Sequence, residues 1–142
     1  MRLILDDIRT LEDFLAELGG TLQRLPMSEC QLGQVRGDRI LLRTGLSPEQ
    51  ELPTLIHELT HWLVHRDVFA GPAHTICEYE AEAVEAFVMV RMGLAHLVTD
   101  TEGLTSADAA DALLAQSKAR VIFAGNRICA ALAIANACAD RR

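Results

Sequence analysis

The spacing of apolar residues near the start of the chain changes from helical to strand-like. Four of them share one face of a helix expected over residues 7–18, before a stop at Gly19-Gly20: Ile8, Leu11, Leu15 and Leu18. Three segments with strand-like composition follow, at residues 21–25, 30–35 and 39–43, and a turn at Gly37-Asp38 separates the last two. This pattern predicts a small, mainly antiparallel sheet.

The rest of the chain has the pattern of helices. Ser47 and Gln50 have the spacing of a capping box, which predicts a helix that starts there and runs to about residue 66. Pro53 has no N–H to donate to residue 49, so the helix either kinks at Pro53 or begins there. Three more helices are expected, at residues 77–92, 106–116 and 118–139.

Length and composition agree with one folded domain. The chain has 142 residues, and 50% of them are hydrophobic, which is enough to bury a core and excludes a disordered protein. We expect a single α+β domain over residues 1–142, with the sheet packed on a helical bundle. No apolar run reaches the roughly 18–20 residues of a membrane span, and the first residues turn acidic too early for a signal peptide. We therefore expect a cytoplasmic protein that does not enter membranes.

Charge and cysteine content narrow the classes of partner. The formal net charge is −7, and the sequence has no basic cluster beyond Arg141-Arg142. A nucleic-acid-binding surface needs basic side chains to neutralise phosphates, so direct binding of DNA or RNA is not expected. The four cysteines include no C-x-x-C pair, which argues against a zinc knuckle.

The stretch at residues 55–65 contains the pattern His-Glu-x-x-His. His57 and His61 stand four residues apart, so on a helix both imidazoles project from one face and can reach one Zn²⁺ ion at about 2.0–2.1 Å. Glu58 is rotated by about 100° from His57 around the helix, which places it beside the ion rather than on it. This position suits a general base that takes a proton from water at the metal.

The residues around this pattern belong in a core. Most of the other positions of the stretch are apolar: Leu55, Ile56, Leu59, Trp62, Leu63 and Val64. Two histidines and a glutamate inside a core need partners, and a metal satisfies all three together. Two protein ligands leave a catalytic zinc under-coordinated, so a third ligand must come from elsewhere in the chain.

Four glutamates of the next predicted helix compete for this role: Glu78, Glu80, Glu82 and Glu85. Glu78, Glu82 and Glu85 share one face, whereas Glu80 lies about 200° around the helix from Glu78. If Glu78 is the ligand, Glu82 stands one turn further on and can orient a neighbouring imidazole. If Glu80 is the ligand, that position holds Val84, which cannot accept a hydrogen bond. The spacing favours Glu78 and leaves Glu80 as the alternative.

Together these two patterns resemble the ImmA/IrrE-type zinc metallopeptidases, zincins in which a glutamate on the next helix is the third ligand. The likeness extends to the C-terminal domain of the ArdC antirestriction proteins, with its His-Glu-Leu-Thr-His-Trp run and an acidic helix containing Ala-Glu, Ala-Phe and Gly-Leu. In this chain these are residues 57–62, Ala81-Glu82, Ala86-Phe87 and Gly93-Leu94. The resemblance covers roughly residues 36–94.

The resemblance implies a compact zincin-like fold of gluzincin type and a Zn²⁺ ion held by His57, His61 and Glu78, with Glu82 supporting a ligand. It also implies cleavage of a protein or peptide substrate, such as a transcriptional regulator. The antirestriction proteins carry an N-terminal domain that binds single-stranded DNA, and many of the regulators contain or pair with a helix-turn-helix segment. Neither is found in this sequence, so the target stays open.

Other residues are weaker candidates for the site. His65 lies one turn beyond His61, too far along a straight helix to share the ion, so we expect it to support a ligand or to interact with the helix C-terminus. His74 and Tyr79 are candidates for stabilising an oxyanion. The strand at residues 39–43 is expected to offer an edge to an extended substrate.

The alternative function is a regulatory or inhibitory binding module in which zinc is structural and proteolysis is weak or absent. A structural zinc site is closed by four protein ligands, whereas a catalytic site keeps one position open. Cys77, next to Glu78, is the residue that could close the site.

Overall fold

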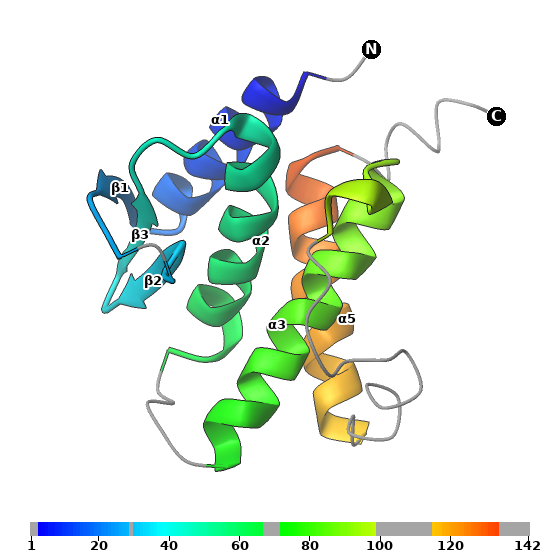
Figure 1. Ribbon diagram of the computed structural model, residues 1–142. Helices are drawn as coiled ribbons and strands as arrows, with labels where there is room; N and C mark the ends of the chain where they lie inside the picture. The colour runs from blue at the N-terminus through cyan, green and yellow to red at the C-terminus, as the bar shows by residue number, and fades with distance from the viewer. Residues whose placement is uncertain (1–2, 29, 67–71, 99–114, 134–142) are drawn as a thin grey trace, which may run out of the picture.

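The computed structural model describes residues 3–28, 30–66, 72–98 and 115–133 (Figure 1). The elements follow in the order α1 (Ile4–Glu17), β1 (Thr21–Leu25), β2 (Gly33–Arg36), β3 (Arg39–Arg43), α2 (Pro48–Val64), α3 (Pro72–Arg91), the 3₁₀ helix η1 (Ala95–Leu97) and α5 (Ala115–Ala131). The predicted α+β class is confirmed. Among the described helices, none is both long enough and apolar enough to cross a membrane.

The three strands form one mixed sheet in the order β1-β3-β2. β2 runs antiparallel to β3, as the turn at Gly37 predicts, but β1 runs parallel to β3, with Thr21 opposite Arg39. The prediction of a mainly antiparallel sheet is therefore wrong. Residues 40–42 are three consecutive apolar side chains that are all buried, and a strand covered on both faces takes the centre of a sheet. Because few residues separate β1 from β2, β2 starts at the end of the sheet where β1 stops and runs against β1, so β3, which runs against β2, is parallel to β1. The chain between β1 and β2 passes β3 to reach the far edge.

The central position of β3 also corrects an expectation about substrate binding. Both sides of β3 are occupied by neighbouring strands, so residues 39–43 offer no edge to a peptide. Among the described strands, β2 instead lies at an edge of the sheet and pairs on one side only, with β3.

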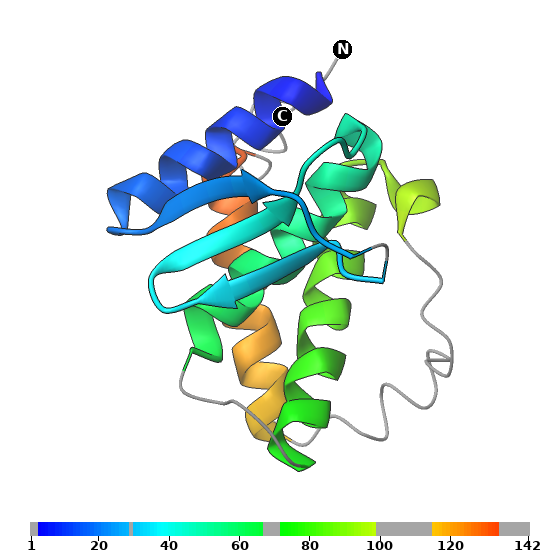
Figure 2. The same ribbon diagram turned by 60° about the vertical axis from the view of Figure 1, so that its left-hand side comes forward.

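Helix α2 is the centre of the molecule. It packs against β2 and β3 on one side and against α3 and α5 on the other, while α1 packs against α2 and β1 (Figure 1, Figure 2). Four of its apolar side chains are fully buried: Leu52, Leu55, Ile56 and Leu59. The same core receives side chains from each of the other helices, among them Ile8, Leu11, Leu15, Val84, Val88, Met89 and Ile128.

The boundaries of the helices follow local chemistry. The predicted capping box is confirmed, since Ser47 Oγ accepts a hydrogen bond from the Gln50 N–H at 3.3 Å and Gln50 Oε1 accepts one from the Ser47 N–H at 3.1 Å. Helix α2 thus begins at Pro48, and Pro53 lies inside it. Helix α3 begins at Pro72 rather than at residue 77, because a proline in the first turn needs no partner for a backbone N–H.

Two predictions fall wholly or partly on other parts of the chain. The helix expected at residues 106–116 lies almost entirely outside the described residues. The helix expected at residues 118–139 corresponds to α5, which begins at Ala115 and ends at Ala131, and the remainder of that prediction reaches past the described residues.

Polar contacts and one close approach fix the sheet on α2. Arg24 of β1 donates from Nε to Glu51 of α2 at 3.0 Å, and the Trp62 indole N–H donates to the carbonyl oxygen of Asp38 at 3.0 Å. β2 approaches α2 so closely that a Cβ added at Gly33 would lie 2.9 Å from Cγ of Glu58. Glycine at this position lets the edge strand lie directly over the His-Glu-x-x-His turns.

This close approach gives a stability prediction for Gly33→Ala. The added methyl group has no space beside Glu58, so we expect the free energy of unfolding to fall by about 1–3 kcal/mol, as in other overpacked sites. Urea denaturation measures the change, and Gln34→Ala, at the neighbouring partly exposed position, is the control. Unchanged stability of Gly33→Ala would mean that β2 does not lie this close to α2.

Candidate metal centre

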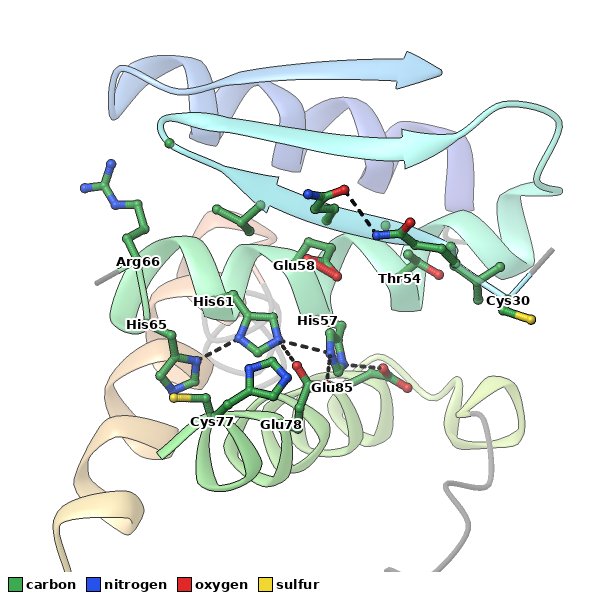
Figure 3. Close-up of a pocket in the computed structure, with 17 residues that line it drawn as sticks. Cys30, Thr54, His57, Glu58, His61, His65, Arg66, Cys77, Glu78 and Glu85 are labelled. Carbon is green, nitrogen blue, oxygen red and sulfur yellow. Dashed lines mark hydrogen bonds and ion pairs between the residues drawn. The ribbon is translucent and has the colours of Figure 1, made fainter. Parts of the chain in front are cut away.

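A cavity of about 600 Å³ lies between β2, α2 and α3 (Figure 3). One wall is formed by residues 30–35, which include most of the edge strand β2 and the segment before it. The opposite wall carries His57, Glu58 and His61 of α2 and Glu78 of α3. The cavity therefore brings the His-Glu-x-x-His pattern and one of the competing glutamates together beside an exposed strand edge.

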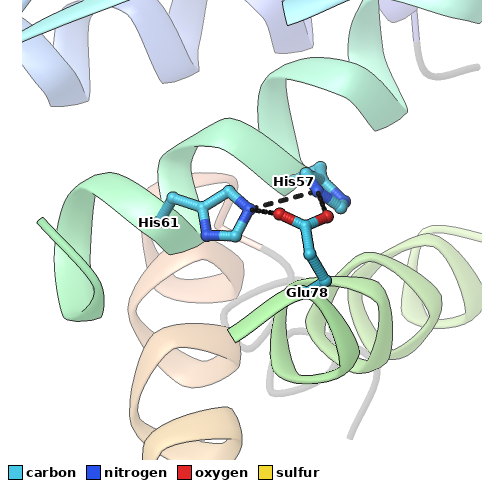
Figure 4. Close-up of side chains that lie close together, drawn as sticks. All are labelled: His57, His61 and Glu78. Carbon is cyan, nitrogen blue, oxygen red and sulfur yellow. Dashed lines mark hydrogen bonds and ion pairs between the residues drawn. The ribbon is translucent and has the colours of Figure 1, made fainter. Parts of the chain in front are cut away.

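Three side chains converge at one point of this cavity (Figure 4). His57 Nε2 lies 3.2 Å from Glu78 Oε2, and His61 Nε2 lies 2.9 Å from Glu78 Oε1. The two Nε2 atoms are 3.2 Å apart. Both imidazoles point the same nitrogen at the glutamate because they project from successive turns of the same face of α2.

The spacing of these atoms fits a zinc ion. Ligand atoms at about 2.0–2.1 Å from Zn²⁺ in a tetrahedron lie about 3.3 Å from one another. The observed separations of 2.9–3.2 Å between His57, His61 and Glu78 are close to this value. Since all three side chains line the cavity, a fourth ligand can reach the ion from solvent. Nitrogen and carboxylate donors are also the chemistry that Zn²⁺ accepts.

The electrostatics of the three residues favour a positive charge at this point. Burial lowers the pKa of His57, but hydrogen bonds to Glu78 and Glu85 outweigh burial and raise this pKa to about 10. The same contact with His57, together with the contact with His61, holds the pKa of Glu78 well below its usual range. In the metal-free protein a proton supplies the positive charge, and a metal ion that binds here releases it.

The second nitrogen of His57 faces the carboxylate of Glu85. His57 Nδ1 lies 3.5 Å from Oε1 of Glu85, which is 8% exposed and lines the cavity. Glu82, expected to support a ligand, is partly buried on α3 and is not among the described residues that line the cavity. Glu85 shares a helix face with Glu78 and Glu82, so the spacing of the glutamates gave no reason to choose Glu85 over Glu82 as the partner of a histidine.

Glu80, the alternative third ligand, is engaged elsewhere. Its carboxylate lies 2.6 Å from His65 Nε2 and accepts hydrogen bonds from two nitrogens of Arg120: Nε, at 2.9 Å to Oε1 and 3.1 Å to Oε2, and Nη2, at 2.7 Å to Oε2. Burial raises the pKa of Glu80, but hydrogen bonds from Arg120, Ser117 and His65 outweigh burial and lower it to about 2. Of the two competing glutamates, the structure brings Glu78 to the histidines.

Glu58 lies beside the converging side chains and against β2 (Figure 3). Its side chain lines the cavity, and the residue is only 7% exposed. Burial raises the pKa of Glu58 above the usual glutamate value, although the neighbouring His57 and His61 oppose this effect. A carboxylate with a raised pKa is a stronger base than an exposed one, which suits proton transfer to and from a reacting group.

The remaining candidates differ in their distance from the site. His65 Nδ1 lies 3.0 Å from His61 Nδ1, as expected of a residue that supports a ligand. His74 is exposed and lines the cavity, whereas Tyr79 is partly buried and is not among the described lining residues. Cys77 lines the cavity but lies outside the converging group, and burial raises the pKa of its thiol, which disfavours the thiolate that binds metal.

Arg120 is the contact residue that the sequence analysis missed altogether. It comes from α5 and stands 40 residues after Glu80, its partner. No spacing rule connects residues so far apart, and a single arginine on a helix carries no signal of its own.

Comparisons with protein families, with curated proteins and with solved structures find no match for this chain.

The geometry predicts the order in which variants lose zinc. Glu78→Gln, His57→Ala and His61→Ala remove ligand atoms, so we expect each to weaken zinc binding by more than about 100-fold. Glu85→Gln alters only the partner of His57, and such changes typically cost about 10–100-fold. Titration of the metal-free protein with zinc against a competing chelator measures these affinities.

Glu82→Gln is the matched control, because it changes another glutamate on the same helix face. Because Glu82 is not among the described residues that line the cavity, we expect this variant to lose less zinc affinity than Glu85→Gln. Unimpaired binding by Glu78→Gln would remove Glu78 from the ligand set, and a larger loss for Glu82→Gln than for Glu85→Gln would show that Glu82 is the supporting carboxylate.

Proposed function

We propose that this protein is a zinc-dependent peptidase with Glu58 as its general base. The observation that carries the proposal is the convergence of His57, His61 and Glu78 to within 2.9–3.2 Å of one another, with Glu58 beside them in an accessible cavity. The resemblance to the ImmA/IrrE-type peptidases and to the ArdC C-terminal domain supports the same function and suggests a zincin-like fold of gluzincin type.

Each residue has a defined part in this chemistry. A Zn²⁺ ion held by His57, His61 and Glu78 would supply Lewis-acid polarisation of a carbonyl group and would lower the pKa of water. Glu58 takes a proton from the attacking water as the water oxygen bonds to the carbonyl carbon of the peptide. Glu58 then gives this proton to the amine nitrogen as the carbon–nitrogen bond breaks. The buried position of Glu58 supports this exchange, because it brings the pKa of the carboxyl group closer to neutral pH.

The edge strand β2 is the best candidate for holding a substrate. Residues 31–35 line the cavity opposite the histidines, and β2 pairs with β3 on one side only. An extended peptide that added to the other side would form backbone hydrogen bonds with β2 and run along the cavity. The absence of a side chain at Gly33 keeps this part of the strand close to Glu58.

The substrate class follows from the resemblance rather than from the cavity. We propose a protein or peptide substrate with a regulatory role, such as a transcriptional regulator. A reducing compartment such as the cytoplasm would suit the free thiols of Cys30, Cys77 and Cys129.

The alternative, a regulatory binding module with a structural zinc, needs a fourth protein ligand. Among the described residues the converging group has three members, and Cys77 is not one of them. This arrangement favours an open, catalytic site over a closed one.

Glu58→Gln separates chemistry from binding. Because Glu58 is not among the converging ligands, we expect this variant to keep its zinc affinity and its fold while cleavage falls by about 10²–10⁴-fold. The zinc-loaded protein is incubated with a library of peptides, and new termini are counted by mass spectrometry. Glu49→Gln, an exposed position on the same helix, serves as the control and should cleave normally.

Two results would contradict the peptidase proposal. Equal numbers of new termini from Glu58→Gln and the unmodified protein would exclude Glu58 as the base. The binding module would be supported if the zinc-loaded protein cleaved no peptide and no candidate regulator, while Glu58→Gln kept whatever cellular activity the unmodified protein has.

A further inference from the structure

The second ring nitrogen of His61, Nδ1, begins a chain of side-chain contacts. His61 Nδ1 lies 3.0 Å from His65 Nδ1, and His65 Nε2 lies 2.6 Å from Oε1 of Glu80. Glu80 is then held by Arg120 of α5, whose Nε and Nη2 atoms donate at 2.9 Å and 2.7 Å. The chain therefore connects the candidate metal centre with the last described helix.

The polar atoms in these contacts are buried, so their hydrogen-bond partners must come from the protein. His65 is 5% exposed and Glu80 is 1% exposed, so solvent has little access to their polar atoms. Buried polar groups require partners of matching donor and acceptor character, because an unpaired group costs about 1–3 kcal/mol. The position of each proton along the chain is thus constrained by its neighbours.

The protons can be assigned from the Arg120 end. A carboxylate that receives two guanidinium N–H groups acts as an acceptor, so Nε2 of His65 donates its proton to Glu80. In a neutral imidazole the other nitrogen is an acceptor, and Nδ1 of His65 accepts the proton that His61 carries on Nδ1. When His61 is neutral, as a metal ligand must be, this arrangement leaves its lone pair on Nε2, the atom that lies 2.9 Å from Glu78.

We propose that His65 is a positioning residue, which holds His61 in the tautomer that presents Nε2 to the metal and is itself anchored by Glu80 and Arg120. This inference rests on the proposed zinc site. The two histidines are oriented by different parts of the fold: Glu85 of α3 faces Nδ1 of His57 directly, whereas His61 depends on a chain that ends in α5. The packing of α5 against α3 therefore affects the geometry of the metal centre.

Two nearly isosteric variants test the role of His65. In His65→Asn the amide oxygen can still accept the proton on Nδ1 of His61, whereas His65→Leu has no acceptor. We expect His65→Leu to weaken zinc binding by about 10–100-fold, the usual loss when a partner of a ligand is removed, and His65→Asn to recover most of that loss. Arg120→Gln should weaken binding in the same direction, while Arg127→Gln, on the same helix and stacked on Phe14 and Phe123, should not.

A second measurement needs neither zinc nor a variant. Long-range proton–nitrogen NMR correlations of the metal-free protein report which imidazole nitrogen carries the proton. We expect Nδ1 of His61 and Nε2 of His65 to be protonated in the unmodified protein, and the tautomers of His61 to mix in His65→Leu. His96→Asn, at an exposed position in η1, is the control and should leave both signals unchanged.

The outcomes separate this inference from the proposed function. A His61 that carries no proton on Nδ1 in the unmodified protein, or equal zinc affinity of His65→Leu and the unmodified protein, would overturn the role of His65. If zinc does not bind the unmodified protein, the peptidase proposal fails, and the metal role of His65 fails with it even if the NMR tautomers are as expected. If zinc binds and the variants rank as expected but no peptide is cleaved, the positioning role stands and the peptidase proposal alone is overturned.

Discussion

Helix α2 lies between the sheet and two other helices, and its polar side chains can be buried there only where those elements supply partners. Arg24 of β1 pairs with Glu51, and Glu78 of α3 contacts both His57 and His61. The contacts that pack the core around α2 therefore also bring the side chains of the site together. An element that shifted away from α2 would expose apolar surface and also leave a buried polar group unpaired.

Features that depend on neighbouring residues could be predicted from the sequence. The strands at residues 21–25 and 39–43, the capping box at Ser47 and the shared face of His57 and His61 each follow from contacts within a turn or a strand. Convergence of Glu78 with the two histidines was also predicted, from the need for a third ligand, from the spacing of Glu78 and Glu82, and from the resemblance to the zinc peptidases. Whether a metal binds at this point is a question for titration rather than for spacing.

Features set by packing could not be predicted in this way. The parallel pairing of β1 with β3 depends on β3 taking the place between β1 and β2, and the start of α3 depends on where the chain turns back along α2. Glu82 and Glu85 share a helix face, and the position of α3 along α2 decides that Glu85 is the one beside His57. Arg120 reaches Glu80 only because α5 packs on α3.

The contact between Arg120 and Glu80 has a consequence for the order of events during synthesis. The His-Glu-x-x-His turns and Glu78 leave the ribosome well before α5, so a nascent chain carries the three converging side chains without the guanidinium that holds Glu80. Bringing Arg120 to Glu80, 40 residues away, costs chain entropy, and the packing of α5 must offset this cost. Until then the Glu80 carboxylate has no guanidinium partner. In the inferred arrangement, a truncated chain that ends before α5 has the full motif, but it lacks the Arg120 contact through which Glu80 and His65 hold His61. The metal centre is therefore complete only after α5 has packed.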